Sequence, residues 1–361
     1  MVNCIYNPNP EATMAKKTTK RSTKRKKKYS RSEIKLSLMV LAILVIALLL
    51  VTAAAYFIPS LREIAIIDEW MSVLENTFAP IDDPQNVVIP EGTVAVYYID
   101  VGQGDATLIV APNGETFLID AGEDEAAANY LQKYNITKLD YLLFTHYDLD
   151  HIGGGDEVLE LCEVKTVIKP NCVPHNKTGQ NLLLDVEEEG STVMHPEAGD
   201  VITMGDVKIE FLVSSTDLPS DFNEKSICIM LTFGKNKFLF TGDSEKEREA
   251  EMIENYGTKL DADVYKAGHH GANNASGAEL MQLVTPEYAI FSCGEGNKYG
   301  HPTAGAIDRI DDYTDKLYRT DTMGTVIFYS DGETITCEIE KGSAPTAWYG
   351  IVFLPPRTKL H

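Results

Sequence analysis

Four side chains of metal-ligand type lie within six residues of one another near the middle of the chain. They are His146, Asp148, Asp150 and His151, within the run Thr145–Gly154. Imidazole nitrogens and carboxylate oxygens together suit divalent metal ions. In the alternative interpretation the two aspartates cap a helix and the two histidines lie on the surface. The rest of the chain helps to decide, because a metal site needs further ligands.

Further residues of these types follow other predicted strands. Asp120 comes directly after the apolar run that ends at Ile119, and Asp243 follows another such run. A His-His-Gly element begins at His269, and His301 stands in the run Asn297–Pro302. Five of the eight histidines therefore occur in these motifs. Ligand residues at the end of one strand after another predict a shared site at one rim of a sheet.

The elements that must position these residues alternate between strand and helix patterns. Predicted strands cover 94–101, 106–111, 116–122, 141–145, 165–169, 207–213, 227–233, 237–241, 262–266, 288–292, 325–329 and 334–340. Helices are expected at 124–134, 245–256, 276–284 and 304–311. Strands precede helices repeatedly, but hairpins also occur. The pattern predicts an α/β fold, with two mixed sheets packed as a sandwich and helices outside.

The N-terminal part has the pattern of a membrane anchor. Residues 36–58 contain no charged residue and no Gly or Pro, and about 20 apolar residues suffice to cross a bilayer. The preceding segment, 1–35, is basic, which predicts a cytoplasmic N-terminus and a domain on the other side of the cell membrane. A signal peptide cleaved after Ala55 is the alternative, followed by secretion. A buried helix of a soluble domain is the third interpretation.

Composition divides the chain into five parts. A basic, disordered cytoplasmic segment (1–35) precedes the anchor (36–58). A juxtamembrane helix and a proline-containing linker occupy 59–92, the folded domain that contains the ligand motifs is expected at 93–341, and a tail covers 342–361. Met14 is an alternative start.

The charge is uneven along the chain. The net charge is −22, and residues 1–35 hold eleven Lys and Arg against two Glu. The remaining chain therefore carries −31, which argues against a stable nucleic-acid partner. Membrane lipid is the expected partner of the N-terminal helix, and a phosphodiester can still be held locally by metal ions.

None of the six cysteines forms a C-x-x-C pair, so a structural zinc site is not expected. Cys162 and Cys172 are interpreted as free thiols, with a disulfide as the alternative.

The motifs resemble those of the metallo-β-lactamase superfamily. Within it they are most similar to the extracytoplasmic domain of the ComEC competence proteins. The loop Asp100–Ala106 (DVGQGDA) and Asp148, where most of the superfamily has a second His, are typical of that group. The elements at 269–271 (HHG) and 299–302 (YGHP) also match. The resemblance covers about 94–340 and implies an αββα sandwich. The channel region of the competence proteins is not in this sequence, so a role in DNA uptake would need partners.

The resemblance implies a site for two divalent metal ions. His146 and Asp148 would bind the first ion, Asp150 and His151 would bind the second, and Asp243 would bridge both. Two such ions lower the pKa of a water molecule held between them, and the hydroxide attacks the substrate.

The remaining positions match the ligand pattern of the family less closely. The resemblance implies His269 as the last ligand of the second ion, ahead of His270, and Asp120 as a residue that orients the metal loop. Asn223 stands where the superfamily usually has a further His, and Asn is a weak ligand. The oxygen-rich first site favours Mn²⁺ or Mg²⁺ relative to Zn²⁺. We therefore expect zinc or manganese.

Other residues are expected to act on the substrate. Asp150 would orient the hydroxide, and His301 and Tyr299 would donate a proton or a hydrogen bond. Lys266 and Asn297 are expected to contact the substrate, although a salt-bridged strand end explains Lys266 equally well. Asp105, in the glycine-rich loop, is expected to close a turn.

The resemblance favours a membrane-anchored metal-dependent phosphodiesterase or nuclease. One alternative is a hydrolase of a lactone, thioester or other acyl substrate, which the superfamily supports in general. The other is an anchored binding module without catalytic activity. The nearly complete set of ligands argues against this last alternative.

Overall fold

The computed structural model describes residues 89–216 and 218–341. The predicted anchor, the basic segment before it and the C-terminal tail lie outside these residues. Among the helices of these two ranges, none has the length and apolarity needed to cross a membrane. The five-part division of the chain stays a prediction.

The first sheet has eight strands in the order β15-β14-β1-β2-β3-β4-β5-β6. Its strands β3 to β6 are parallel, and the other pairs are antiparallel. The bounds are β1 (Val94–Tyr98), β2 (Thr107–Val110), β3 (Thr116–Ile119), β4 (Lys138–Leu143), β5 (Glu163–Ile168), β6 (Thr192–Met194), β14 (Val326–Ser330) and β15 (Ile335–Ile339).

The second sheet has seven strands in the order β13-β12-β11-β10-β9-β8-β7. Strands β10 to β13 are parallel, and β7 to β10 are antiparallel. The bounds are β7 (Val201–Met204), β8 (Val207–Phe211), β9 (Ile229–Phe233), β10 (Asn236–Phe240), β11 (Val264–Lys266), β12 (Tyr288–Phe291) and β13 (Leu317–Arg319). The expected sandwich of two mixed sheets with outer helices is confirmed.

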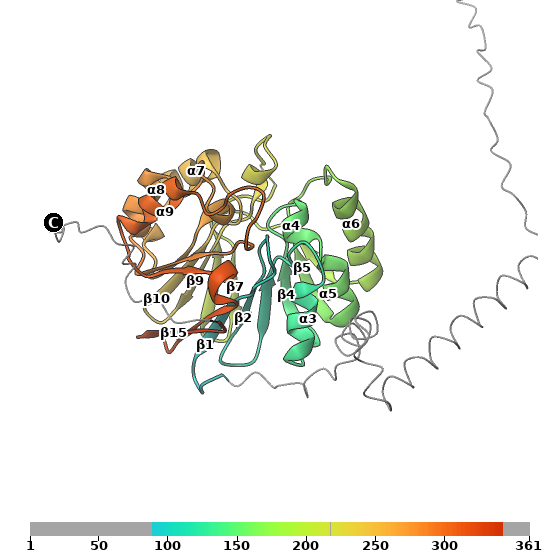
Figure 1. The fold of residues 1–361 in the computed structure, drawn as a ribbon. Coiled ribbons are helices and arrows are strands. Elements are labelled where there is room, and N and C mark those ends of the chain that lie inside the picture. The colour runs from blue at the N-terminus through green and yellow to red at the C-terminus, as the bar shows by residue number, and fades with distance from the viewer. Residues whose placement is uncertain (1–88, 217, 342–361) are drawn as a thin grey trace, which may run out of the picture. The chain divides into compact units, whose positions relative to one another are not determined.

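The helices cover the outer faces of the two sheets (Figure 1). Helices α3, α5 and α6 lie on the first sheet, and α7, α8 and α9 lie on the second. The bounds are α3 (Ala126–Lys133), α4 (Leu149–Ile152), α5 (Gly155–Leu161), α6 (Lys177–Glu189), α7 (Lys246–Tyr256), α8 (Ala278–Val284), α9 (Ala304–Asp311) and α10 (Thr320–Met323). Short 3-10 turns are η2 (Asn223–Lys225), η3 (Gly257–Leu260) and η4 (Gly268–Gly271).

Alternation along the strands explains why the first sheet is buried on both faces. In β1, Val94, Val96 and Tyr98 belong to the core between the sheets. Their neighbours Ala95 and Tyr97 belong to the core beneath the helices. Successive side chains of a strand point to opposite faces, so a strand without polar residues must be covered on both sides.

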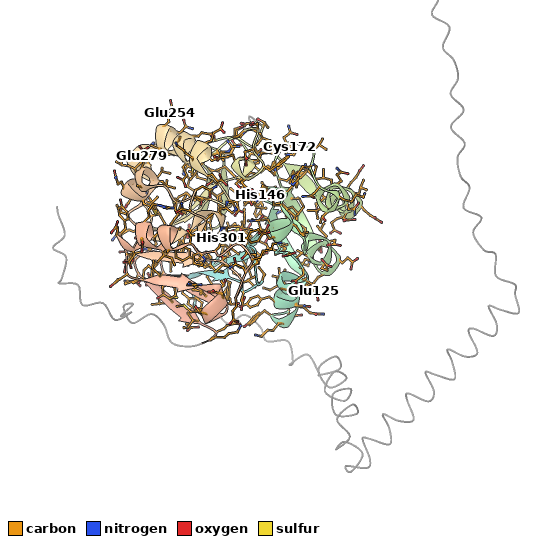
Figure 2. All side chains as sticks on the ribbon, turned by 45° about the horizontal axis from the view of Figure 1, so that its top comes forward. Glu125, His146, Cys172, Glu254, Glu279 and His301 are labelled. Carbon is orange, nitrogen blue, oxygen red and sulfur yellow. The ribbon has the colours of Figure 1, made fainter. Side chains whose placement is uncertain are left out.

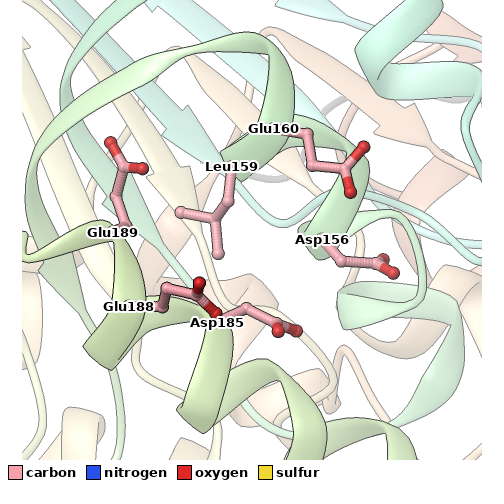
Figure 3. A pocket seen from close by; sticks show the side chains of 6 residues that line it. All are labelled: Asp156, Leu159, Glu160, Asp185, Glu188 and Glu189. Carbon is pink, nitrogen blue, oxygen red and sulfur yellow. The ribbon is translucent and has the colours of Figure 1, made fainter.

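Helix α6 was not predicted from the sequence. Only Gly179, Leu182 and Val186 are buried among its 13 residues, so the apolar stripe is narrow. It packs beside α5, and the two helices leave a groove lined by five acidic side chains and one leucine (Figure 3). These residues are Asp156, Leu159, Glu160, Asp185, Glu188 and Glu189.

Glu249 is a buried carboxylate that joins α7 to the start of α8. Its side chain accepts a hydrogen bond from the Gly277 backbone N–H at 2.9 Å, and the residue is 5% exposed. Burial raises the pKa of Glu249 to about 7. Because this value lies above that of an unfolded chain, the stability it contributes is complete below about pH 4.5 and is lost as the pH rises through 7.

We therefore expect Glu249→Gln to stabilise the protein at pH 8 and not at pH 5. The gain at pH 8 should be about 1–3 kcal/mol, because the neutral amide avoids ionising a buried group. Thermal unfolding of both proteins between pH 5 and pH 8 measures the difference. The exposed Glu247→Gln in the same helix is the control. Parallel pH profiles for Glu249→Gln and the unaltered protein would contradict the shifted pKa.

Candidate metal centre

The candidate site lies at the carboxyl ends of four strands. Strands β3 and β4 are parallel neighbours, as are β10 and β11. Asp120 follows β3, His146 comes three residues after β4 ends, and Asp243 comes three residues after β10 ends. The turn η4 follows β11. Because parallel strands end at the same edge, the sequence motifs meet there.

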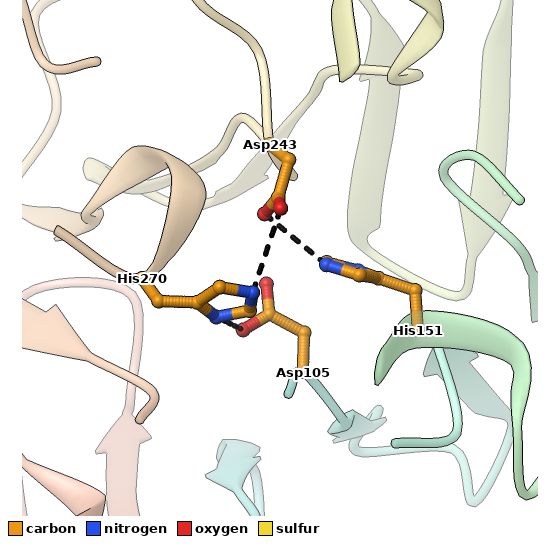
Figure 4. A group of neighbouring side chains, drawn as sticks. All are labelled: Asp105, His151, Asp243 and His270. Carbon is orange, nitrogen blue, oxygen red and sulfur yellow. Dashed lines mark ion pairs between the residues drawn. The ribbon is translucent and has the colours of Figure 1, made fainter. Parts of the chain in front are cut away.

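Four buried side chains form the centre of this site (Figure 4). They are Asp105, His151, Asp243 and His270, and ligand atoms from all four lie within 4.8 Å of one another. Asp243 lies between two imidazoles: its Oδ1 is 3.1 Å from Nε2 of His151, and its Oδ2 is 3.5 Å from Nε2 of His270. The arrangement is a candidate metal-binding cluster.

Two predicted ligands border these four residues. His146 is fully buried, and its Nε2 lies 4.0 Å from Oδ2 of Asp243. Asp150 places Oδ2 3.2 Å from Nε2 of His270. Asp148 lies outside the cluster of four, with a half-buried side chain whose Oδ1 faces His175 at 3.5 Å.

The second ring nitrogen of each buried imidazole is held by an outer group. Nδ1 of His151 lies 2.8 Å from Oδ2 of Asp120. Nδ1 of His270 lies 3.0 Å from the Ser292 carbonyl and 3.1 Å from Oδ1 of Asp105. Such contacts fix the orientation of a metal-ligating imidazole. The predicted role of Asp120 as an orienting residue is consistent with this contact.

Several buried atoms near Asp243 have no hydrogen bond of regular geometry. They are the Nε2 atoms of His146, His151 and His270 and Oδ1 of Asp243 itself, whose neighbours are one another. Buried polar atoms in proteins are normally hydrogen-bonded. Several unsatisfied ligand atoms that converge on one point fit divalent cations, which need such a set of nitrogen and oxygen donors.

The charges of the buried imidazoles depend on their carboxylate neighbours. Burial alone would lower the pKa of His151 and His270, but Asp243 and the outer carboxylates raise both well above the usual value. At His146 burial outweighs the opposing effect of Asp243 and Asp150, and the pKa is lowered to about 3. Without metal, protons on His151 and His270 therefore offset the charge of Asp243. A metal ion would replace these protons.

Gly153 and Gly154, which follow the metal-ligand run, have no room for a side chain. A Cβ atom added to Gly154 would lie 2.1 Å from the carbonyl oxygen of Asp124, and one added to Gly153 would lie 2.1 Å from that of Glu123. The loop between β4 and α5 therefore passes too close to the loop after β3 for any side chain. This explains the Gly-Gly pair that ends the metal-ligand run.

The structure places His270 in the buried cluster and His269 at its rim. Both residues have positive φ, at 47° and 54°. The turn places the side chain of His270 in the interior, 1% exposed, and that of His269 at the rim, 22% exposed. Nδ1 of His269 contacts Oε1 of Glu245 at 3.1 Å, and its Nε2 lies 3.6 Å from Asp243. His270 is thus the better placed ligand.

The contacts of Lys266 favour the alternative interpretation, a salt-bridged strand end. Its side chain is 2% exposed, and Nζ lies 2.8 Å from Oδ2 of Asp105 and donates to the Ala267 carbonyl at 2.9 Å. Asp105 was expected only to close a turn, but it contacts both Lys266 and His270. Because Lys266 already occupies Oδ2, we interpret Asp105 as a group that orients His270.

The structure shows Asn297 in a network of hydrogen bonds within its own loop, and its predicted substrate contact stays a prediction. Its Oδ1 accepts hydrogen bonds from the backbone N–H groups of Tyr299 and His301, and its Nδ2 donates to the Gly294 carbonyl at 3.0 Å. Asn297 therefore shapes the loop that carries Tyr299 and His301.

The predicted weak ligand Asn223 contacts a carboxylate next to the cluster. Its side-chain amide donates a hydrogen bond to Oε1 of Glu245 at 3.1 Å, and the same carboxylate faces His269.

His301 and Tyr299 extend the site towards solvent. The ring of His301 lies 5.5 Å from that of His269 and 6.4 Å from that of His270, measured between centroids. Tyr299 stacks on His301 and is 54% exposed. Burial lowers the pKa of His301. Figure 2 places the side chains of His146 and His301 within the folded body of the domain.

Comparison with protein families decides the classification. Residues 99–295 match the model of the "Metallo-beta-lactamase superfamily". The chain belongs to this superfamily. The matched segment contains every residue of the buried cluster and ends before His301. The fold implied by the motifs is thereby confirmed for the described domain.

Several similar proteins carry names that refer to competence or recombination. ComE operon protein 3 of Bacillus subtilis (strain 168) is 30% identical over 248 residues, which is 63% of this chain and 32% of that protein. Competence protein ComA of Neisseria gonorrhoeae is 31% identical over 244 residues, covering 66% and 33%. The resemblance to the ComEC family is therefore confirmed. The chain spans about a third of the length of these relatives.

Solved structures with a similar fold are more distant in sequence. CmlA, a diiron β-hydroxylase from Streptomyces venezuelae, is 17% identical with a TM-score of 0.44, covering 64% of this chain and 53% of that one. The metallo-β-lactamase fold protein YhfI from Bacillus subtilis is 12% identical with a TM-score of 0.42, covering 62% and 95%.

Proposed function

We propose that this protein is a metal-dependent phosphodiesterase anchored in the cell membrane, with its catalytic domain outside. The convergence of three unsatisfied imidazole nitrogens on Asp243 supports the metal dependence. The superfamily consists in general of metal-dependent hydrolases. The similarity to competence proteins favours a phosphodiester substrate over an acyl substrate.

Two groups of residues would hold the metal ions. His146 and Asp148 are assigned to the first ion, and Asp150, His151 and His270 to the second, with Asp243 between them. When bound, divalent ions would lower the pKa of a water molecule and polarise the phosphoryl group. Three imidazoles and three carboxylates supply the site, which suits zinc or manganese.

The residues around this centre have separable tasks. Asp120 and Asp105 hold the imidazoles of His151 and His270 so that each Nε2 faces inwards. Asp150 is the most accessible carboxylate next to His270, with a 21% exposed side chain, and would orient the attacking water. His301 is neutral before substrate binds, because its pKa is lowered. A bound phosphodiester anion would raise that pKa and favour protonation next to the leaving group.

Hydrolysis of bis(p-nitrophenyl) phosphate tests this proposal. The purified chain should be inactive after metal removal and active after addition of Mn²⁺ or Zn²⁺. Asp150→Ala should lower kcat at least about 100-fold, because it removes a group next to the reacting atoms. Metal content of both proteins, measured by mass spectrometry, separates loss of metal from loss of orientation.

Two other results would support the alternatives. If the protein binds two metal ions but leaves the phosphodiester intact, lactones and thioesters become the substrates to try. If it binds no metal ion, the assignment of the cluster is wrong and a binding module takes its place.

A further inference from the structure

The short segment Asn223–Ser226, which contains the turn η2, contacts the backbone that leads from β10 into α7. We propose that Glu224 of this segment is a positioning residue of the metal centre. Its buried carboxylate fixes the backbone around Asp243, so that Asp243 meets the buried imidazoles and Glu245 meets His269. The inference rests on the metal dependence in the proposed function and adds a residue that acts through others.

Helix α7 begins without a capping side chain of its own. Glu245 stands at its N-cap position and makes no capping hydrogen bond, so the first backbone N–H groups need other acceptors. The carboxylate of Glu224, a residue that is 5% exposed, supplies them. It accepts hydrogen bonds from the N–H groups of Glu245 at 3.1 Å, Glu247 at 2.6 Å and Arg248 at 2.9 Å. Because hydrogen bonds to a charged acceptor are stronger than neutral ones, this carboxylate ties η2 firmly to α7.

Arg248 completes this connection from the side of the helix. Its buried guanidinium donates through Nε to the Glu224 carbonyl at 2.5 Å and through Nη2 to the Ser214 carbonyl at 2.9 Å. Its Nη1 lies 2.5 Å from Oε2 of Glu251. Glu224 and Arg248 therefore bind each other's backbone: the carboxylate accepts from the Arg248 N–H, and the guanidinium donates to the Glu224 carbonyl. The position of η2 is thereby coupled to the start of α7.

Asp243 lies in the stretch of backbone that this connection fixes. Strand β10 ends before Asp243 and α7 begins after Glu245, so neither element sets the backbone between them. The N–H of Asp243 donates to Oγ of Ser226 at 3.1 Å, and the N–H of Glu245 donates to Glu224. Side chains of the segment Asn223–Ser226 therefore hold two of the three backbone N–H groups from Asp243 to Glu245, one at each end.

The same segment lies beside two imidazoles of the site. Oγ of Ser226, which is fully buried, lies 3.4 Å from Nδ1 of His146. The amide of Asn223 donates to Oε1 of Glu245, and this oxygen lies 3.1 Å from Nδ1 of His269. A shift of the segment would therefore move Asp243 and turn both imidazoles. Groups that orient metal ligands in this way contribute about 10- to 100-fold to metal affinity.

The affinity of the full chain in detergent for Mn²⁺ tests the inference. Glu224→Gln keeps the size of the side chain but presents a neutral amide with one acceptor oxygen, which cannot serve three N–H groups. It should raise the Kd for Mn²⁺, measured by calorimetric titration, about tenfold. In the metal-free protein, hydrogen exchange of the peptide that contains Asp243 and Glu245 should become at least about threefold faster. The electron paramagnetic resonance spectrum of bound Mn²⁺ should also change, because its ligands are displaced.

A control variant separates positioning from loss of stability. Asp263 is also a carboxylate that accepts a backbone N–H, from Lys237 at 2.8 Å. It precedes β11 and so lies at the end of that strand away from the site. Asp263→Asn should lower the urea midpoint but leave the Kd for Mn²⁺ and the exchange of the Asp243 peptide unchanged. Glu224→Asp keeps the charge with a shorter reach. It should raise the Kd less than Glu224→Gln does, and it decides the inference if Glu224→Gln does not fold.

Failure of the inference and failure of the proposed function give different results. If the chain cleaves the phosphodiester and Glu224→Gln keeps the Kd of the unaltered protein, the inference is overturned and the phosphodiesterase stands. Equal rises of the Kd in Glu224→Gln and Asp263→Asn would also overturn it, because loss of stability would explain both. If the chain binds Mn²⁺ but cleaves no phosphodiester, the proposed function fails and the Kd values still decide the inference. If the unaltered chain binds no Mn²⁺, both fail, because there is no metal centre to position.

Discussion

Asp243→Asn is expected to remove at least one metal ion and to lower hydrolysis by about a thousandfold or more. Asp243 is the residue on which the buried imidazoles converge, at 3.1 Å from His151, 3.5 Å from His270 and 4.0 Å from His146. An amide is neutral and presents only one acceptor oxygen. It can neither bridge two ions nor offset their charge. The loss should therefore exceed that of any single imidazole.

Metal stoichiometry and affinity are the measurements that check this result. The unaltered protein should bind two ions, and Asp243→Asn should bind at most one, with a raised Kd. Thermal unfolding without metal should show that the variant folds, since Asp120 and Asp105 still contact His151 and His270. Asp308→Asn, on the exposed side of α9, is the matched control. If Asp243→Asn still binds two metal ions, the assignment of Asp243 as a metal ligand is contradicted.

The strand-end ligands could be predicted from the sequence because their signal is local. An apolar run that is followed within three residues by His146 or Asp243 predicts both a buried strand and a ligand near its end. The meeting of these strand ends follows from parallel pairing, β3 with β4 and β10 with β11. The family motifs added the two-metal assignment. The described domain agrees with this outline.

The choice between His269 and His270 could not be made from the sequence. It depends on left-handed backbone geometry at two consecutive residues, which places one ring inside and the other at the rim. Neither residue is of a type that favours positive φ as glycine does. The signal that was missed is Gly271, whose φ of 84° allows the turn to close against Phe291 and Pro302.

Contacts between residues far apart in the chain could not be predicted from the sequence either. Lys266 and Asp105 are separated by most of the domain, and nothing in either motif indicates that they form a buried ion pair. The same holds for His175 and Phe222, which come from different loops and stack at 3.9 Å. Motif analysis identifies residues that touch metal, whereas the groups that orient or surround them depend on tertiary packing.

A second large effect, on stability, is expected from breaking the buried ion pair between Lys266 and Asp105. Lys266→Met should destabilise the metal-free protein by about 3–5 kcal/mol, because it leaves a buried carboxylate without its cation. Burial alone would raise the pKa of Asp105, but Lys266 and His270 lower it to about 2. Without Lys266 the burial effect should raise that pKa. Protonation then relieves part of the loss, so the destabilisation should be smaller at pH 5 than at pH 8.

Urea unfolding at the two pH values measures this change in the free energy of unfolding. Lys208→Met is the matched control, because Lys208 pairs with Glu210 at 2.6 Å on the surface, with 46% of its side chain exposed. An exposed pair of this kind contributes less than about 1 kcal/mol. Equal losses for the two lysine variants would show that the Lys266–Asp105 pair is not buried in solution.

A double variant separates the stability of the pair from its effect on the metal centre. Lys266→Met with Asp105→Asn should recover most of the lost stability, since no buried charge is left unpaired. Its affinity for metal should stay about tenfold or more below that of the unaltered protein, because a neutral amide is a weaker acceptor for Nδ1 of His270. Recovery of stability with persistent loss of metal affinity would assign Asp105 to the orientation of His270. Recovery of both stability and metal affinity would show that the Lys266–Asp105 pair has only a structural role. The hydrogen bond to the Ser292 carbonyl would then be sufficient to orient the imidazole of His270.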